Sequence, residues 1–264
     1  MSIAVTTSRK VNTKLKDVAF SIADELCCEY IVRGKQRIDE VFHLGYDVLI
    51  VVCPQRIKVL SLIEESVVEE FFFHPGMALI RLNRLQSGIG DNMVDSMGLC
   101  VGDSLLDCTL GMGSDAIVAS YVVGESGRVV ALESSPIIYA VVKRGLLSWC
   151  ENPELVEPMR RIEVINTDYE SYLKSTNDEY DVVYFDPMFE CPIESSKGIS
   201  PMRRFAKTGG VDVESFERAK DIARKSVVIK ADVNSQMLED LRIIATKGNR
   251  VGSFEYGILK RARG

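Results

Sequence analysis

Histidine is scarce in this chain, and closely spaced pairs of metal ligands are missing. The 264 residues include two histidines and seven cysteines, and no cysteines have the C-x-x-C spacing. Zinc sites are usually built from such pairs, so the sequence predicts no metal centre. The odd number of cysteines, several of them inside apolar runs, indicates reduced thiols rather than a disulfide framework. We therefore expect a cytoplasmic protein.

Long apolar runs, internal repeats and low-complexity tracts are also missing. No window of about 18 consecutive apolar residues occurs, so no helix is expected to span a bilayer. Residues 1–17 lack the apolar core of a secretion signal. The composition that remains, 46% apolar and 27% charged, is typical of a globular protein with a full core.

An excess of positive charge is missing as well. The chain has 32 Lys and Arg against 38 Asp and Glu, a net charge of −6. This balance argues against nucleic-acid binding over the whole surface, but it leaves room for a local basic patch.

Two parts of different pattern follow one another along the chain. Residues 1–77 predict a small α/β domain, with a helix over 13–27 and strands over 46–53, 56–62 and 67–73, the last two as a hairpin. The His74-Pro75-Gly76 segment breaks this pattern, and we place the domain boundary near residue 77.

Residues 78–264 alternate between apolar strands and helical stretches. Strands are expected at 103–109, 128–133, 161–166, 181–186 and 226–230, with helices near 114–123, 135–149, 212–224 and 235–246. A hairpin is expected over 250–254 and 256–260. Continuous apolar strands joined by helices predict a doubly wound, mostly parallel, Rossmann-like α/β sheet.

Ligands of such sheets bind beyond the carboxyl ends of the strands. The first strand ends in Asp107 and is followed by a turn with Thr109, Gly111 and Gly113, while the second ends in Glu133. Glycines allow a ligand to approach the backbone, and a carboxylate can accept both hydroxyls of a ribose. An ordinary strand–turn–helix with a surface glutamate explains the same residues equally well.

Two cofactors compete for this turn. Gly111-x-Gly113-x-x-Ala116 fits a dinucleotide fingerprint. Asp107, however, places negative charge where a pyrophosphate would bind, and it suits the positively charged S-adenosylmethionine (SAM) instead. The sign of this charge favours SAM.

The fourth strand ends in Asp186-Pro187-Met188-Phe189. The Asp186 carboxylate and the Pro187 carbonyl can each accept one N–H of an exocyclic amine on a base. Phe189 can stack on that base, a contact worth about 1–3 kcal/mol. A strand ending in an Asp turn, with Phe189 in the core, is the plain alternative, but the order of Asp107, Glu133 and Asp186 favours a catalytic site.

Residues 78–260 resemble the class I SAM-dependent methyltransferases, and among them the small-subunit ribosomal RNA guanine-N2 methyltransferases of the RsmJ type. The motifs that carry this resemblance are DCTLGMGSDAIVAS (107–120), ALESSP (131–136), VVYFDPMF (182–189), ESSKGISPMRRF (194–205), KSVVIK (225–230) and KGNR (247–250). Ser114 and Glu190 depart from the family pattern, and residues 1–77 do not match it.

The resemblance implies a set of cofactor contacts and a substrate. Further contacts with SAM are expected from Ser114, Asp115, Glu133, Ser134, Asp168 and Tyr169, with Asp186 bordering both cofactor and base. The implied substrate is a guanine N2 amine in small-subunit ribosomal RNA.

Basic residues provide candidate RNA contacts. Lys197, Arg203, Arg204 and Lys207 follow the DPMF motif, and Lys230 ends the fifth strand. Phosphate contacts from these residues would position an RNA strand while a base enters the pocket. A second group, Arg9, Lys10, Arg33, Lys35 and Arg37, is either a solvated face or an RNA-docking surface.

The sequence thus predicts an enzyme that methylates a guanine amine of ribosomal RNA. The alternatives are a methyltransferase acting on another amine, of adenine, a protein or a small molecule, and a non-catalytic ribosome-assembly factor. An NAD-dependent oxidoreductase is disfavoured by Asp107. The sequence does not set the oligomeric state.

Overall fold

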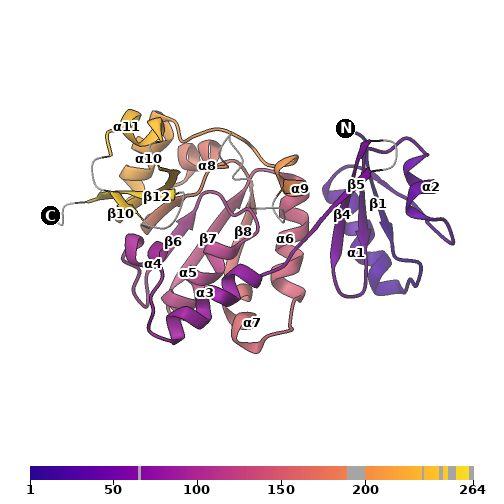
Figure 1. Cartoon of the computed structure of the whole chain (residues 1–264), viewed down its shortest axis with the longest axis horizontal. Coiled ribbons are helices and arrows are strands. Elements are labelled where there is room, and N and C mark those ends of the chain that lie inside the picture. The colour runs from indigo at the N-terminus through magenta and orange to yellow at the C-terminus, as the bar shows by residue number, and fades with distance from the viewer. Residues whose placement is uncertain (65–66, 189–199, 234, 244–245, 249–253, 262–264) are drawn as a thin grey trace. The chain divides into compact units, whose positions relative to one another are not determined.

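The computed structural model describes residues 1–64, 67–188, 200–233, 235–243, 246–248 and 254–261 (Figure 1). The chain forms two compact units. The first comprises Met1–His74, Pro136–Trp149 and Ile193–Phe205, and the second comprises Pro75–Ser135, Cys150–Pro192 and Ala206–Gly264. The expected functional division near residue 77 remains a prediction.

The first unit is built on a five-stranded sheet of order β2-β1-β3-β4-β5. The strands are β1 Ile3–Thr7, β2 Glu29–Tyr30, β3 Val48–Val52, β4 Ile57–Glu64 and β5 Val67–Phe72, and the helices are α1 Thr13–Glu25, α2 Ile38–Phe42, α6 Pro136–Ser148 and α9 Ser200–Arg203. Strands β1, β2 and β3 are parallel, whereas β4 and β5 form the expected antiparallel hairpin. The sequence patterns did not predict β1, although four of its five residues are buried.

The second unit contains a seven-stranded sheet of order β11-β12-β10-β9-β6-β7-β8. Its strands are β6 Ser104–Asp107, β7 Arg128–Glu133, β8 Ile162–Asn166, β9 Tyr180–Phe185, β10 Ala223–Asp232, β11 Thr246–Gly248 and β12 Phe254–Lys260. Its helices are α3 Gly76–Gln86, α4 Asn92–Met97, α5 Ser114–Val123, α7 Pro153–Arg160, α8 Tyr169–Ser175, α10 Val213–Ile222 and α11 Gln236–Asp240. In the described chain, no helix is both long and apolar enough to cross a membrane.

The predicted doubly wound topology is confirmed. Strands β10, β9, β6, β7 and β8 run parallel, and β12 and β11 add an antiparallel edge. From β6 the chain winds outward through β7 and β8, and it then returns to β9 on the other side. Helix α5 packs against β6, β7 and β8, while α10 packs against β9 and β10 (Figure 1). The order of the strands reverses at β6, so the carboxyl ends of β6 and β9 border the crevice where such sheets bind ligands.

The last part of the chain differs from the prediction. The helix expected over 235–246 is wrong in length, because α11 ends at Asp240 and β11 begins at Thr246. Arg242 has a φ of 55°, a left-handed conformation that stops a helix. Strand β11 pairs with β12, so the terminal hairpin starts earlier than expected. The first predicted arm lies, except for Phe254, outside the described residues.

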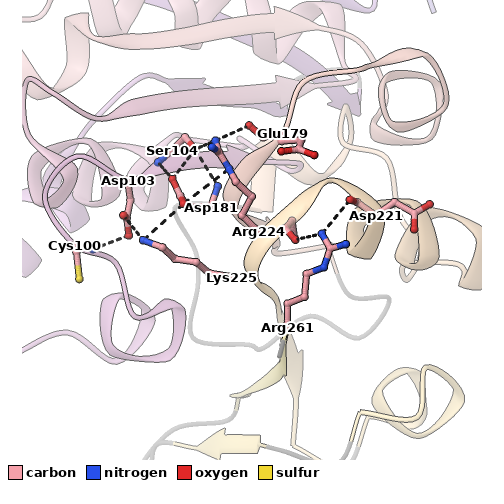
Figure 2. A network of polar contacts seen from close by, with 10 residues as sticks. Cys100, Asp103, Ser104, Glu179, Asp181, Asp221, Arg224, Lys225 and Arg261 are labelled. Atoms are coloured by element: carbon pink, nitrogen blue, oxygen red, sulfur yellow. Dashed lines mark hydrogen bonds and ion pairs between the residues drawn. The ribbon is translucent and has the colours of Figure 1, made fainter. Parts of the chain in front are cut away.

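A polar network ties together the amino ends of β6, β9 and β10 (Figure 2). The Ser104 N–H and hydroxyl both donate to Asp181 Oδ2 at 2.9 Å, and the Asp181 N–H donates to Ser104 Oγ at 2.9 Å. Lys225 Nζ contacts Asp103, and it lies 3.7 Å from Asp181 Oδ1. Arg224 Nη2 donates to Ser104 Oγ at 3.2 Å. We call Asp103, Ser104, Asp181, Arg224 and Lys225 the amino-end network.

Candidate active site

Asp107 is the last residue of β6, and it is almost completely buried, with 1% of its surface exposed. Its Oδ1 accepts a hydrogen bond from the Thr109 N–H at 3.0 Å, but its Oδ2 is buried and has no partner among the described residues. Burial raises the pKa of Asp107 to about 8. A buried oxygen without a donor costs folding free energy, so this atom fits a donor supplied by a ligand.

The turn between β6 and α5 is held to its two neighbouring strands. Gly111 and Gly113 have φ values of 51° and 78°, which side-chain-bearing residues rarely adopt. The Gly111 N–H donates to Glu133 Oε2 on β7 at 3.1 Å. Thr109 Oγ1 accepts the Asp186 N–H, which follows β9, at 2.6 Å. The structure therefore brings these five predicted residues, from three strand ends, to one place.

Glu133 ends β7 and is buried. Its Oε1 accepts the Ser135 N–H at 2.8 Å, and its Oε2 accepts the Gly111 N–H. Burial raises the pKa of Glu133 to about 7, although these backbone hydrogen bonds act in the opposite direction. Each oxygen keeps a second lone pair, which is what a ribose diol requires. Ser134 lies beside it and is half-buried.

Asp168 and Tyr169 lie at the start of α8, and their side chains already have partners within the protein. Asp168 caps the helix by accepting from the Ser171 N–H at 2.8 Å and from the Ser171 hydroxyl at 3.0 Å. The Tyr169 ring packs edge-on against Phe185 at 5.4 Å, and its hydroxyl donates to the Gly210 carbonyl. The predicted SAM contacts at these two residues remain predictions, and at Tyr169 they would have to use the backbone.

Asp115, in the first turn of α5, belongs to an ion-pair network that the sequence did not reveal. Arg81 on α3 contacts Asp115. Its Nε and Nη2 also donate to Asp91 Oδ2 and Oδ1, at 2.7 and 2.8 Å. The Tyr184 hydroxyl donates to Asp115 Oδ2 at 2.8 Å. Burial would raise the pKa of Asp115, but Lys230 and Arg81 hold it well below its usual range. Ser114, beside Asp115, is half-buried.

Asp186 and Lys230 form an ion pair at the carboxyl ends of β9 and β10. The register of these parallel strands pairs Phe185 with Ile229, so the next residues, Asp186 and Lys230, lie side by side. Lys230 Nζ is 2.8 Å from Asp186 Oδ2, and it also lies 5.0 Å from the Phe254 ring centroid. Burial raises the pKa of Asp186, and the charge of Lys230 opposes that rise.

The remaining predicted residues are spread more widely. Pro187 is buried directly after Asp186, whereas Phe189 and Lys197 lie outside the described residues. Lys207 is ion-paired with Glu170 at 2.6 Å. Arg204 Nη1 donates to the Leu62 carbonyl at 3.4 Å, and Arg203 ends α9. Lys230, predicted to contact RNA phosphates, is paired with Asp186 within the site, and the phosphate contact stays a prediction.

The site is dominated by carboxylates. Asp107, Asp115, Glu133 and Asp186 come from three neighbouring strand ends and the first turn of α5. Such a set suits a ligand that carries positive charge and hydroxyl groups, and it does not suit a pyrophosphate. Among the residues that the structure describes, no group of His, Cys, Asp and Glu could hold a metal ion.

Three of the matches with known proteins each cover most of the chain. Residues 57–254 match the family "Putative SAM-dependent methyltransferase". The chain is 37% identical over 258 residues to the uncharacterized protein YpiP of Bacillus subtilis, which covers 97% of this chain and 98% of that protein. It is 28% identical over 211 residues to the ribosomal RNA small subunit methyltransferase J of Salmonella arizonae, covering 76% and 83%.

A solved structure shares the fold. The crystal structure of a SAM-dependent methyltransferase from Neisseria gonorrhoeae superposes with a TM-score of 0.62, covering 97% of this chain and 95% of that one. The two sequences are 13% identical, so this likeness shows the fold alone.

Proposed function

The chain belongs to the family of putative SAM-dependent methyltransferases, and from this premise we propose that it methylates the N2 amine of a guanine in small-subunit ribosomal RNA. The family and the shared fold make SAM its cofactor. SAM supplies an electrophilic methyl group on a sulfonium cation. The residues of this chain would have to hold both this cofactor and the amine.

The residues at the ends of β6 and β7 fit SAM. Asp107 Oδ2 is a buried acceptor without a donor, and the α-ammonium group of SAM carries such donors. Glu133 presents free lone pairs for two ribose hydroxyls, while its backbone hydrogen bonds to Gly111 and Ser135 fix its orientation. The turn carries a carboxylate rather than a phosphate-binding group, in agreement with a cofactor that has no phosphate.

Asp186 is the residue that would act on the amine. The lone pair of a guanine amine is delocalised into the ring, so acceptors that hold its N–H groups increase its nucleophilicity. The Asp186 carboxylate can accept one N–H and the Pro187 carbonyl the other. The charge of Lys230 favours the ionised form of Asp186, which can accept the hydrogen bond. Burial raises the pKa of Asp186, and this higher pKa makes the carboxylate a better acceptor for the amine proton.

One observation carries the proposal. The hydrogen bond from the Asp186 N–H to Thr109 Oγ1 fixes the amine acceptor directly beside the turn that would hold the cofactor. Catalysis of methyl transfer depends mainly on such positioning of donor and acceptor. The RNA substrate is supported by the similarity to the ribosomal RNA small subunit methyltransferase J of Salmonella arizonae, at 28% identity.

Transfer of a tritiated methyl group tests the proposal. Purified protein would be incubated with tritiated SAM and small-subunit RNA, as free RNA and as subunits, from cells that lack the gene. We expect label in RNA, and N2-methylguanosine after digestion to nucleosides. RNA from wild-type cells, already methylated, is the control and should accept little label.

Two other results would change the conclusion. Label in N6-methyladenosine would keep an RNA methyltransferase and replace the base. Absence of label in RNA, with SAM binding intact by calorimetry, would reject the RNA substrate in favour of another amine.

A further inference from the structure

Three loops of the first unit follow the carboxyl ends of its parallel strands, on the same side of the sheet. Strands β1, β2 and β3 are parallel, and each is followed by one loop: residues 8–12, 31–37 and 53–56. The Ser8 N–H donates to the Val52 carbonyl at 2.9 Å, and the Ile31 N–H donates to the Val5 carbonyl at 2.8 Å. The first residues of two loops are therefore tied to the strands beside them, and all three loops are neighbours.

These loops carry positive charge only. They contain six Lys and Arg and no Asp or Glu: Arg9, Lys10, Arg33, Lys35, Arg37 and Arg56. Five of the six are exposed, and Arg33 is half-buried. Of these six residues, Arg37 has an ion pair, with Asp39 at 3.1 Å, and the other five have none to the described carboxylates. We call these other five residues, without Arg37, the basic edge.

The members of the basic edge are close enough to affect one another. Burial lowers the pKa of Arg33, and the neighbouring charge of Arg9 lowers it further. Arg56 stacks over the Phe72 ring with its guanidinium carbon 4.3 Å from the centroid, which fixes its orientation. Like charges held together without acidic partners repel, so a polyanion would relieve an existing cost.

Acidic residues gather at the opposite, amino ends of the same strands. Asp24 and Glu25 end α1, Glu29 begins β2, and Asp47 directly precedes β3. Asp47 accepts the Ser2 N–H at 2.7 Å, and Glu25 is paired with Arg144. Charge is thus separated between the two ends of these strands.

We propose that the basic edge docks the phosphate backbone of the RNA substrate. This inference rests on the proposed function, because an RNA methyltransferase with a net charge of −6 needs a local positive surface to hold a polyanion. Two of the cations predicted to do this in the second unit are already in ion pairs, Lys207 with Glu170 and Lys230 with Asp186. The five cations of the basic edge, which have no ion pair with the described carboxylates, meet the requirement.

Salt-dependent RNA binding tests the proposal. The probe is a fluorescein-labelled single-stranded RNA, a uridine oligomer of about 30 nucleotides, long enough to reach several cations. The variant is Arg9→Ala with Lys35→Ala, and the matched control is Arg160→Ala with Lys174→Ala, two exposed cations of the second unit that are ion-paired. Fluorescence anisotropy would be measured over a series of salt concentrations.

The expected effect follows from counterion release. Each lost phosphate contact with single-stranded RNA lowers the slope of log K against log salt by about 0.7, so the test variant should lose about 1.4. At 0.1 M salt this corresponds to binding weaker by roughly 10- to 30-fold. The control variant should keep the wild-type slope. Calorimetric SAM affinity should be unchanged in both variants, and this result shows that the protein is still folded.

The outcomes separate this proposal from the proposed function. If wild-type protein methylates ribosomal RNA while the test variant keeps its slope and its RNA KM, the docking surface is wrong and the function stands. If the variant loses RNA affinity but no RNA is methylated, docking stands and the function is wrong. Loss of binding to phosphatidylglycerol vesicles, with RNA binding unchanged, would assign the basic edge to a membrane and overturn the RNA proposal.

Discussion

Carboxylates at the two ends of the parallel sheet in the second unit have pKa values that are shifted in opposite directions. At the amino end, Asp181 receives two hydrogen bonds from Ser104 and the charge of Lys225, and these hold its pKa below the usual value despite burial. At the carboxyl end, burial raises the pKa of Asp107 to about 8 and that of Glu133 to about 7. The same contrast occurs along one strand. Asp181, near the amino end of β9, has a lowered pKa, whereas burial raises the pKa of Asp186, which follows the carboxyl end of β9.

This difference separates residues that stabilise the fold from residues kept for a ligand. A carboxylate that has hydrogen-bond donors on one oxygen and cations near the other contributes to stability, whereas a buried one with an orphaned oxygen costs free energy until a partner arrives. The amino-end network is complete without any ligand (Figure 2). Asp107 lacks a donor for its buried Oδ2, and the free energy that this costs is what we expect of a residue that binds a ligand.

The largest expected effect comes from breaking the carboxyl end of β9. Asp186→Ala should lower the rate of methyl transfer by about 100- to 1,000-fold, the usual loss when one positioned group is removed from a reaction centre. SAM affinity, measured by calorimetry, should change by only a few-fold. Asp181→Ala, at the other end of the same strand, is the matched control and should lower thermal stability while the rate is kept.

Equal loss of rate in both folded variants would mean that the two ends of β9 do not differ in function. Asp186→Asn provides a further check, because it keeps the size of the side chain while removing the charge that pairs with Lys230. It should also be strongly impaired.

The next effect concerns Asp107, where stability and binding should move in opposite directions. Asp107→Asn should weaken SAM binding by about 10- to 100-fold, the range for a lost hydrogen bond to a charged group. The same change should raise the melting temperature of the free protein. Calorimetric titration and thermal unfolding of one protein sample would show both effects.

The stabilisation by Asp107→Asn should depend on pH with a definite sign. The folded pKa, about 8, lies above the unfolded value, so ionisation of the unfolded chain favours unfolding as the pH rises towards 8. The asparagine variant lacks this penalty. Its gain in melting temperature should therefore be small near pH 4 and largest near pH 8, and a constant gain would contradict the raised pKa.

A smaller effect is expected in the pH dependence of SAM binding. Asp107 must lose its proton to hold a cation, and with a pKa of about 8 it is mostly protonated in the free protein at pH 7. Affinity should rise by about 20-fold between pH 6 and 7.5, with release of a proton on binding. Calorimetry in two buffers of different ionisation enthalpy measures that release, and Asp107→Asn should reduce it.

The smallest effect is expected at the amino end. Lys225→Met removes a side chain that is more than one-third exposed, so the loss should be about 1 kcal/mol or less. The melting temperature should fall by about 2–4 °C for each kcal/mol. The difference should shrink as the pH falls through the lowered pKa of Asp181, and SAM affinity should not change. A loss of SAM affinity here would break the distinction between the two ends.

Much of the site could be predicted because it lies at strand ends. Asp107, Glu133 and Asp186 each follow a run of apolar residues, and parallel topology alone brings such positions to one edge. Strand β1 was missed because its five residues stand next to a polar, basic segment that resembles a flexible terminus. Helix α11 was predicted too long because apolar spacing continues past the left-handed residue Arg242.

Other site residues gave no local signal. Arg81 is one of two arginines in α3, and its role arises from the packing of α3 against α5, where Asp115 lies more than 30 residues away in the sequence. Lys230 was recognised as a strand-end cation, but its partner follows from the register of β9 and β10. Neither contact is encoded in neighbouring residues.

The sequence by itself determined the sheet type and the cofactor, and it predicted Asp186 as the amine acceptor, because apolar periodicity and the residues after each strand are local features of the chain. The tertiary structure alone decided which charges are paired. Lys230 meets Asp186, Arg81 meets Asp115, and Asp107 keeps one oxygen without a partner. Ion pairs form between side chains that packing brings within a few ångströms, whatever their separation in sequence, and that distance sets their strength.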